Sequence, residues 1–195
     1  MNEPDALAAA DSDAMQRLRD GDDLALNDLM ARWQQPLVRH IFRYTQNEAD
    51  ALDLAQETFV RIYQHRAKYD TRARFSTWLY TIATRLCRNQ ARWKLRHPAI
   101  SLELESSPGA ALEDTLSSPG PTPDQQAGHR ELDHAIAAAF AALPDDQRTA
   151  ALLQTYEALP SLEIARILGC SAKAIEGKLY RARQFLREKL SPWVT

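Results

Sequence analysis

The stretch at residues 97–128 constrains the fold most, because no regular element is expected to run through it. Its sequence, HPAISLELESSPGAALEDTLSSPGPTPDQQAG, holds five of the ten prolines and three of the six glycines in this 195-residue chain. Proline removes a backbone donor and glycine adds backbone entropy, so both oppose a helix. We therefore predict a flexible acidic linker at residues 98–128, between a first domain at residues 1–97 and a second at residues 129–195.

Both flanking halves carry the apolar spacing of three and four residues that is typical of amphipathic helices. In the first half, the expected inward stripe of one helix is Leu52, Ala55, Phe59 and Ile62. Hydrophobic residues make up 45% of the chain, enough for ordinary cores, and alanine and leucine are plentiful. We predict an all-α protein of two small helical domains.

Three residues of the first half mark where its helices are expected to bend or begin. Pro36 lies inside an apolar pattern and is expected to kink or break that helix. Ser76 or Thr77 is the expected N-cap of the helix that follows, because short hydroxyl side chains accept from free N–H groups at a helix start.

The sequence SLEIARILGCSAKAIEGKLYRARQFL, residues 161–186, predicts two short helices around a tight turn. Ser161 and Ser171 are candidate N-caps, and Gly169 suits the left-handed conformation that ends helices. The pattern is that of a helix-turn-helix, whose second helix fits the major groove of DNA. An ordinary helical hairpin with a charged outer face is the alternative. The candidate DNA contacts on the second helix are Lys173, Glu176, Gly177, Lys178, Tyr180, Arg181 and Arg183.

Charge is distributed unevenly although the net charge is only −2. Residues 71–102 and 166–189 each hold seven Lys or Arg, and the acidic segment 98–128 holds none. Two basic blocks indicate two contacts with a polyanion, with solvated helix faces as the alternative. Glu176 lies on the DNA-facing side of the second block, where it either accepts from a cytosine amino group or repels phosphate.

Several other classes of function are disfavoured by the sequence. Cys87 and Cys170 have no CxxC partner, and the five scattered histidines supply no zinc-ligand spacing, so we expect no metal and no cofactor. We find no arrangement of nucleophile and base and no glycine-rich phosphate loop, so we do not expect an enzyme. No apolar run approaches a membrane span and no signal peptide is recognisable, so we expect a cytoplasmic protein without membrane insertion.

Three stretches together resemble one family. They are DLAQETFVRIYQH, FSTWLYTIATRLCRNQARWKLR and the helix-turn-helix sequence, in that order and with a linker between the second and third. This combination is similar to bacterial sigma factors of the extracytoplasmic-function group in the sigma-70 family. The resemblance implies a first domain that binds core RNA polymerase and opens the minus-ten promoter element. It implies a second domain that reads the minus-thirty-five element.

The resemblance also assigns roles to residues of the first domain. It implies core polymerase binding by Asp53, Gln56 and Glu57. It implies contacts with minus-ten DNA by a group of mostly basic side chains and one loop aromatic: Tyr69, Arg85, Arg88, Asn89, Arg92, Lys94 and Arg96. Many members of the group are held inactive by an anti-sigma factor, so such a partner is expected beside polymerase and promoter DNA.

Two positions depart from the family pattern. Arg85 stands where asparagine is common, and Glu176 where a basic or small polar residue is usual. We expect Glu176 to shift the minus-thirty-five sequence that is read, or to weaken that contact. Two other functions remain open: a stand-alone helix-turn-helix regulator that acts without polymerase, and a sigma-like decoy that sequesters an anti-sigma factor.

Overall fold

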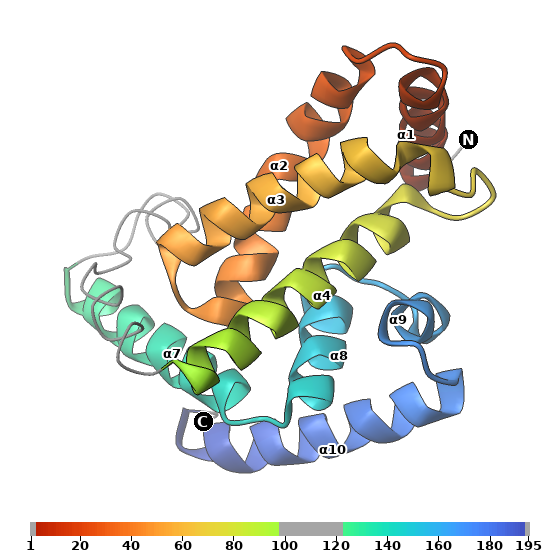
Figure 1. Cartoon of the computed structure of the whole chain (residues 1–195). Helices are drawn as coiled ribbons and strands as arrows, with labels where there is room; N and C mark the ends of the chain where they lie inside the picture. Colours follow the sequence, from red (N-terminus) through yellow and green to blue (C-terminus); the bar gives the residue numbers. More distant parts are fainter. Residues whose placement is uncertain (1–2, 98–122, 194–195) are drawn as a thin grey trace. The chain divides into compact units, whose positions relative to one another are not determined.

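The computed structural model describes residues 3–97 and 123–193, and all the regular elements within those ranges are helices (Figure 1). They form two compact units, one before residue 98 and one after residue 122. The all-α prediction with two helical units is therefore confirmed. Most of the predicted linker lies outside the described residues, but residues 123–128 belong to a helix that begins at Pro123. Proline suits a first helical position, where its missing N–H costs nothing, so a proline-rich segment can end in a helix start.

The N-terminal unit consists of α1 (Glu3–Arg19), α2 (Ala25–Thr45), α3 (Glu48–His65), the single turn η1 (Arg66–Lys68) and α4 (Phe75–Arg96). Helices α2, α3 and α4 pack against one another, and α1 lies against α2, α4 and η1 (Figure 1). Their shared core is built from large side chains with almost no exposure, among them Leu29, Leu37, Ile41, Ile62 and Leu79.

Helix α2 runs through Pro36 as one helix, so of the two expected effects of this proline, a kink or a break, the break does not occur. Proline removes the bond to the carbonyl of Arg32, and an interior proline costs about 3 kcal/mol. The residues that follow, Leu37, Val38 and Ile41, are all buried. Burial of three such side chains stabilises the helix by more than that cost, at roughly 1.5–3 kcal/mol each.

The expected caps of α4 are wrong, because the helix begins at Phe75 and its N-cap is Arg74, without a side-chain hydrogen bond. Phe75 is buried, so tertiary packing rather than a hydroxyl fixes this helix start. In α3 the expected stripe is partly wrong: Ala55, Phe59 and Ile62 are buried, but Leu52 is 44% exposed. The buried side of α3 includes Leu54 instead, which directly precedes Ala55 of the predicted stripe.

The C-terminal unit consists of α7 (Pro123–Ala141), α8 (Asp145–Thr155), α9 (Ser161–Leu168), α10 (Ala172–Leu190) and the turn η2 (Ser191–Trp193). Helix α10 packs on α7, α8 and α9, and its buried residues are Ile175, Leu179 and Ala182. Helix α10 is therefore the element that joins the other helices of this unit.

The turn between α9 and α10 has the local structure that its residues predict. Gly169 is left-handed, with φ 66° and ψ 39°, and its N–H donates to the carbonyl of Ala165. The hydroxyl of Ser171 accepts from the N–H of Ala174 at 3.2 Å and so caps α10. The N-cap of α9 is Pro160 rather than Ser161, and no side chain caps it. The two helices thus form a helix-turn-helix.

Candidate functional site

The exposed side of α3 combines acids, an amide and apolar side chains. Asp53 and Gln56 are exposed, and Glu57 is partly exposed and accepts from Nε of Arg61 at 2.7 Å. Leu52 is 44% exposed and Val60 46%, which is high for large apolar side chains. We call this surface, with Leu52, Asp53, Gln56, Glu57 and Val60, the α3 face. Exposed apolar side chains with a charged rim are typical of a protein-binding surface.

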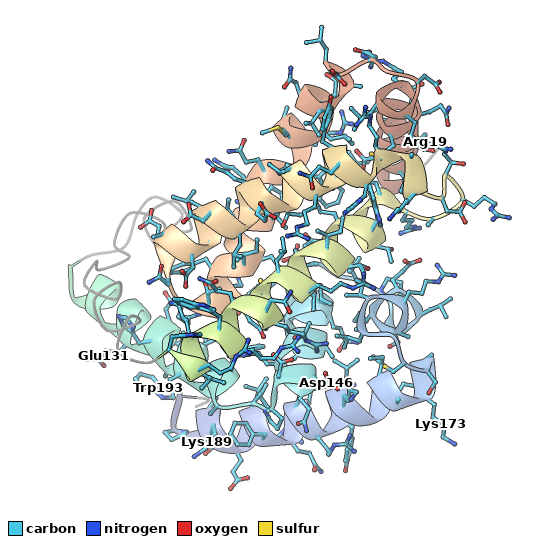
Figure 2. All side chains as sticks on the ribbon, viewed as in Figure 1. Arg19, Glu131, Asp146, Lys173, Lys189 and Trp193 are labelled. Carbon is cyan, nitrogen blue, oxygen red and sulfur yellow. The ribbon has the colours of Figure 1, made fainter. Side chains whose placement is uncertain are left out.

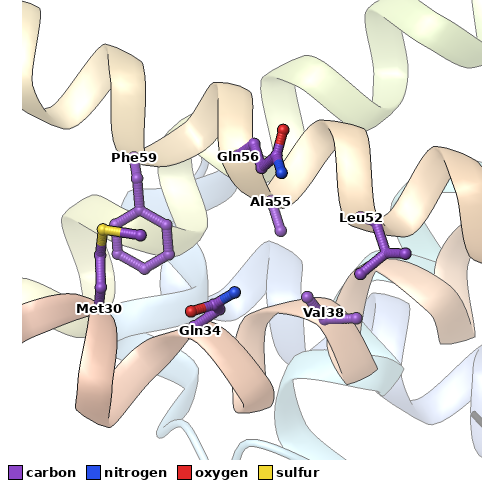
Figure 3. A pocket seen from close by; sticks show the side chains of 7 residues that line it. All are labelled: Met30, Gln34, Val38, Leu52, Ala55, Gln56 and Phe59. Carbon is purple, nitrogen blue, oxygen red and sulfur yellow. The ribbon is translucent and has the colours of Figure 1, made fainter.

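A small groove between α2 and α3 borders the α3 face (Figure 3). Gln34 and Gln56 face each other across it, one from each helix (Figure 3). Leu52 closes one end of the groove and Phe59 lies towards the other (Figure 3). The full lining is Met30, Gln34, Val38, Leu52, Ala55, Gln56 and Phe59. The exposure of Leu52 follows from its place at this edge, outside the packed contact of the two helices.

Helix α4 presents one basic face, on which Arg85, Asn89, Arg92 and Arg96 are all exposed. Their spacing of four, three and four residues places them on a single side of the helix. Arg92 donates to Oδ1 of Asn89 at 3.1 Å, and Nε of Arg96 donates to the Arg92 carbonyl at 3.2 Å. Half-buried Arg88 lies beside this row, which we call the α4 face. Such a row of cations on one side fits a phosphate backbone.

Lys94 differs from the other predicted cations of α4, because it points to α3. Its Nζ lies 2.7 Å from Oδ2 of Asp50, and the two side chains are only 19% and 16% exposed. Gln90 also donates to Asp50, at 3.1 Å. The structure therefore gives Lys94 an ion pair that joins the end of α4 to the first turn of α3, away from the exposed row.

Tyr69 is buried, with 3% of its surface exposed, in the loop between η1 and α4. Its ring lies 5.1 Å from that of Trp78 and 6.4 Å from that of Phe75, and its hydroxyl donates to the Ala73 carbonyl at 2.7 Å. Burial, with the charges of Asp11 and Asp70, raises its pKa to about 12. Because the ring is buried, a base can stack on it only if the loop moves. In this structure Tyr69 instead supports the loop through its packing on Phe75 and Trp78 and its hydrogen bond to Ala73.

On α10 the predicted DNA-facing side chains are mostly exposed. Lys173, Glu176, Arg181 and Arg183 are exposed, and Tyr180 is 59% exposed with its hydroxyl accepting from Gln184. The helix-turn-helix supplies a second basic surface on a helix whose opposite side is buried. We call this surface the α10 face.

One contact of α10 was not visible in the sequence. Nζ of Lys178 lies 2.6 Å from Oδ2 of Asp146, which projects from the first turn of α8 (Figure 2). A Cβ at Gly177 would lie 3.7 Å from the guanidinium of Arg181, which is ordinary van der Waals contact. An alanine side chain at position 177 would therefore fit without rearrangement.

Residues 3–97 and 123–193 hold no group of three or more His, Cys, Asp or Glu side chains placed to share a metal ion. No helix in the same ranges is both long and apolar enough to cross a bilayer.

Comparison with known proteins identifies both units. The family model described as Sigma-70 region 2 matches residues 29–96, and that described as Sigma-70, region 4 matches residues 133–186. The ECF RNA polymerase sigma factor SigW of Bacillus subtilis is 28% identical over 176 residues, covering 90% of this chain and 94% of the relative. The ECF RNA polymerase sigma-E factor of Escherichia coli K12 is 28% identical over 185 residues, covering 92% and 94%.

Two solved structures share the fold. CnrH, solved with the cytosolic domain of CnrY, has a TM-score of 0.68 and 24% identity, covering 94% of this chain and 98% of that one. The sigma factor RpoE of Bartonella quintana, solved with the anti-sigma factor NepR, has a TM-score of 0.66 and 21% identity, covering 86% and 98%. The order of the two matched regions and the full-length relatives agree: the chain belongs to the extracytoplasmic-function group of sigma-70 family RNA polymerase sigma factors.

Proposed function

We propose that this sigma factor divides promoter-specific initiation between its units, with residues 1–97 binding core RNA polymerase and minus-ten DNA and residues 129–195 binding minus-thirty-five DNA. One observation carries the proposal. The N-terminal unit presents an acid–amide face on α3 and a basic face on α4, and the C-terminal unit presents a basic helix-turn-helix. A protein that joins polymerase to DNA needs surfaces of these two chemistries.

The α3 face is the proposed contact with polymerase. Asp53, Gln56 and Glu57 suit a basic partner helix, whose long-range attraction speeds encounter and whose matching charges set register. Leu52 and Val60 add apolar area that becomes buried on docking.

The α4 and α10 faces are the proposed contacts with promoter DNA. Arg85, Arg92 and Arg96 would hold the phosphates of the opened minus-ten strand, while Asn89 offers an amide to an unstacked base edge. Arg88 is half-buried beside them and would support the same strand. Lys94 is assigned the lesser role, because its charge is already neutralised by Asp50.

In the C-terminal unit the α10 face would lie in the major groove. Exposed Lys173, Arg181 and Arg183 suit phosphates or guanine edges, and Tyr180 offers a ring beside them. Glu176 is exposed among these cations, so it would select cytosine or reject neighbouring phosphate.

Regulation by an anti-sigma factor is the proposed control. RpoE was solved in complex with the anti-sigma factor NepR, and this chain shares its fold. The apolar side chains exposed on α3 offer such a partner a surface to cover. We place the protein in the cytoplasm, where bacterial transcription occurs, and assign it no enzyme activity of its own.

Transcription in vitro tests the proposal. Core RNA polymerase is mixed with the protein and a genomic promoter pool, and the transcript starts are sequenced. New starts that share two spaced elements are expected. Binding to core polymerase without new starts would support a decoy, and duplex binding without core binding would support a stand-alone regulator.

Charge reversal locates the polymerase contact. Asp53→Lys on the α3 face should weaken binding to core polymerase by about tenfold, because it places a cation against a basic partner. The matched control is Asp23→Lys, an exposed acid in the turn between α1 and α2. Equal effects of the two variants would refute the assignment of α3.

Replacement of Glu176 tests the reading of the minus-thirty-five element. Glu176→Arg should change which bases are enriched in selected promoters, whereas Glu188→Arg, exposed near the far end of α10, should leave them unchanged. Identical base preference and affinity for Glu176→Arg and the unaltered protein would overturn the role given to this acid.

A further inference from the structure

The N-terminal helix α1 carries a carboxylate that is buried against α2. Asp11 is 2% exposed; its Oδ1 accepts from Nε of Arg32 at 2.8 Å and its Oδ2 from Nε1 of Trp33 at 3.0 Å. Burial raises the pKa of Asp11, and the hydrogen bonds from Arg32 and Trp33 act in the opposite direction. A buried carboxylate is costly unless it is paired, so this contact allows little variation in geometry.

Trp33 links the hydrogen bond with Asp11 to α4, because its ring contacts two residues of that helix. Its ring packs edge-on against Phe75, with centroids 6.0 Å apart, and against Tyr80, with centroids 6.2 Å apart. The hydrogen bond to Asp11 fixes the plane of the indole, because the N–H must point at the carboxylate. The first residue of α4, Phe75, is therefore set by a residue of α1 through the Trp33 ring.

The loop before α4 rests on the same aromatic cluster. Phe75 and Trp78 lie against Tyr69, and Tyr69 closes the loop by its hydrogen bond to the Ala73 carbonyl. Within the loop, the N–H of Ala73 donates to the Asp70 carbonyl at 2.9 Å. Helix α1 also packs directly on η1, the turn that leads into this loop. Both ends of the loop thus depend on α1.

We propose that Asp11 is a positioning residue for minus-ten recognition, which it serves by fixing Trp33 and, through the aromatic cluster, the loop at residues 69–74. The inference rests on the proposed function in one respect, the assignment of minus-ten DNA to this loop and to α4. The acid-rich helix α1 then has a task beyond covering the core: it sets the shape of the surface that receives the promoter.

Amide hydrogen exchange gives the first test and does not depend on transcription. Asp11→Ala should speed exchange at Ala73 by about tenfold, because losing the acceptor leaves the part-buried indole N–H without its carboxylate partner and frees the ring. Asp13→Asn is the matched control, an exposed acid on the same helix, and should leave the exchange rate unchanged. Unchanged exchange at Ala73 in Asp11→Ala would overturn the inference.

Promoter selection with core RNA polymerase gives the second test. Asp11→Ala and Trp33→Phe should each lower the preference among minus-ten bases by about tenfold while the preference among minus-thirty-five bases stays constant. Asp11→Asn should retain most of the preference, because its amide oxygen still accepts from Trp33 and the part-exposed Arg32 can turn to water.

A purely structural role is excluded by a variant matched in stability. Ile41→Val, in the core of α2 and outside the aromatic cluster, should lower the melting temperature without changing minus-ten preference. If Asp11→Ala and this core variant relax the minus-ten preference equally, Asp11 only stabilises the unit and the inference fails. If the unaltered protein yields no promoter-specific starts, the proposed function fails instead, and the exchange result still decides whether Asp11 orders the loop.

Discussion

The ion pair between Lys178 and Asp146 engages a cation of α10 that we propose as a DNA contact, so removing the acid should strengthen DNA binding. The two charged atoms lie 2.6 Å apart, with the side chains 21% and 50% exposed. A pair this exposed contributes only ~0.5 kcal/mol to stability. Asp146→Asn therefore leaves the unit folded while Lys178 becomes available to a phosphate.

The expected gain follows from counterion release. One added phosphate contact steepens the slope of log affinity against log salt by about 0.9. At about 0.15 M salt that slope corresponds to roughly fivefold tighter binding. The gain should shrink steadily as salt is raised, whereas a gain from new base contacts would persist.

The assay is a salt titration of promoter binding by the complex of this protein with core RNA polymerase, followed by fluorescence anisotropy. Asp145→Asn is the matched control, because it removes the same charge from the same first turn of α8 but pairs with Arg148 rather than Lys178. Adding Lys178→Gln to Asp146→Asn should abolish the gain.

The refuting result is specific. If Asp146→Asn and Asp145→Asn change the salt slope equally, the effect is only the loss of a negative charge near DNA. If Asp146→Asn flattens the slope, the ion pair orients Lys178 for a phosphate contact instead of withholding its charge from one.

Three further predictions concern stability. Asp50→Ala should lower the free energy of unfolding by ~2–3 kcal/mol in urea titrations, because it leaves the mostly buried Lys94 without its partner, and a smaller loss would contradict that account. Gly169→Ala should cost about 1 kcal/mol, measured the same way, because φ is +66° there, whereas Gly177→Ala within α10 should stabilise slightly. The raised pKa of Tyr69 favours its neutral form in the folded state, so its contribution is complete below pH 10 and is lost as pH rises towards about 12. Tyr69→Phe should therefore weaken the alkaline decline in stability relative to the unaltered protein, and an identical decline would refute the argument.

Local features of the fold were predictable from sequence. Gly169 and Ser171 end one helix and begin the next through bonds to residues within five positions, so residue type and spacing sufficed. The expected caps Ser76, Thr77 and Ser161 failed, because Phe75 and Pro160 define those helix starts through packing and backbone geometry. Prediction of an N-cap uses only the residues next to it in the chain, so it does not take tertiary packing into account.

The candidate site was predictable in its surfaces but not in its pairings. The exposed row Arg85, Asn89, Arg92 and Arg96 follows from helical spacing. The ion pair of Lys94 with Asp50 joins residues of different helices, so nothing near Lys94 in the sequence indicates it. The roles of these residues in polymerase and DNA binding stay predictions.

Long-range contacts explain the remaining differences. The hydrogen bond from Trp33 to Asp11 spans 22 positions and places a carboxylate in the core, where charged side chains are uncommon. The burial of Tyr69 follows from the aromatic side chains that α4 brings beneath the loop. Both contacts depend on helix packing, which periodicity alone does not specify.

The fastening of α4 to α3 by Lys94 and Asp50 has a geometric consequence for initiation. Because the ion pair is mostly shielded and Gln90 reinforces it, the two helices cannot slide past each other without leaving charges unpaired. Helices α3 and α4 then move as one rigid body, so the angle between the α3 face and the α4 face is fixed. A partner that binds the α3 face would thereby also fix the direction of the row from Arg85 to Arg96. Under the proposed function, this protein itself would set the distance from polymerase to the opened strand.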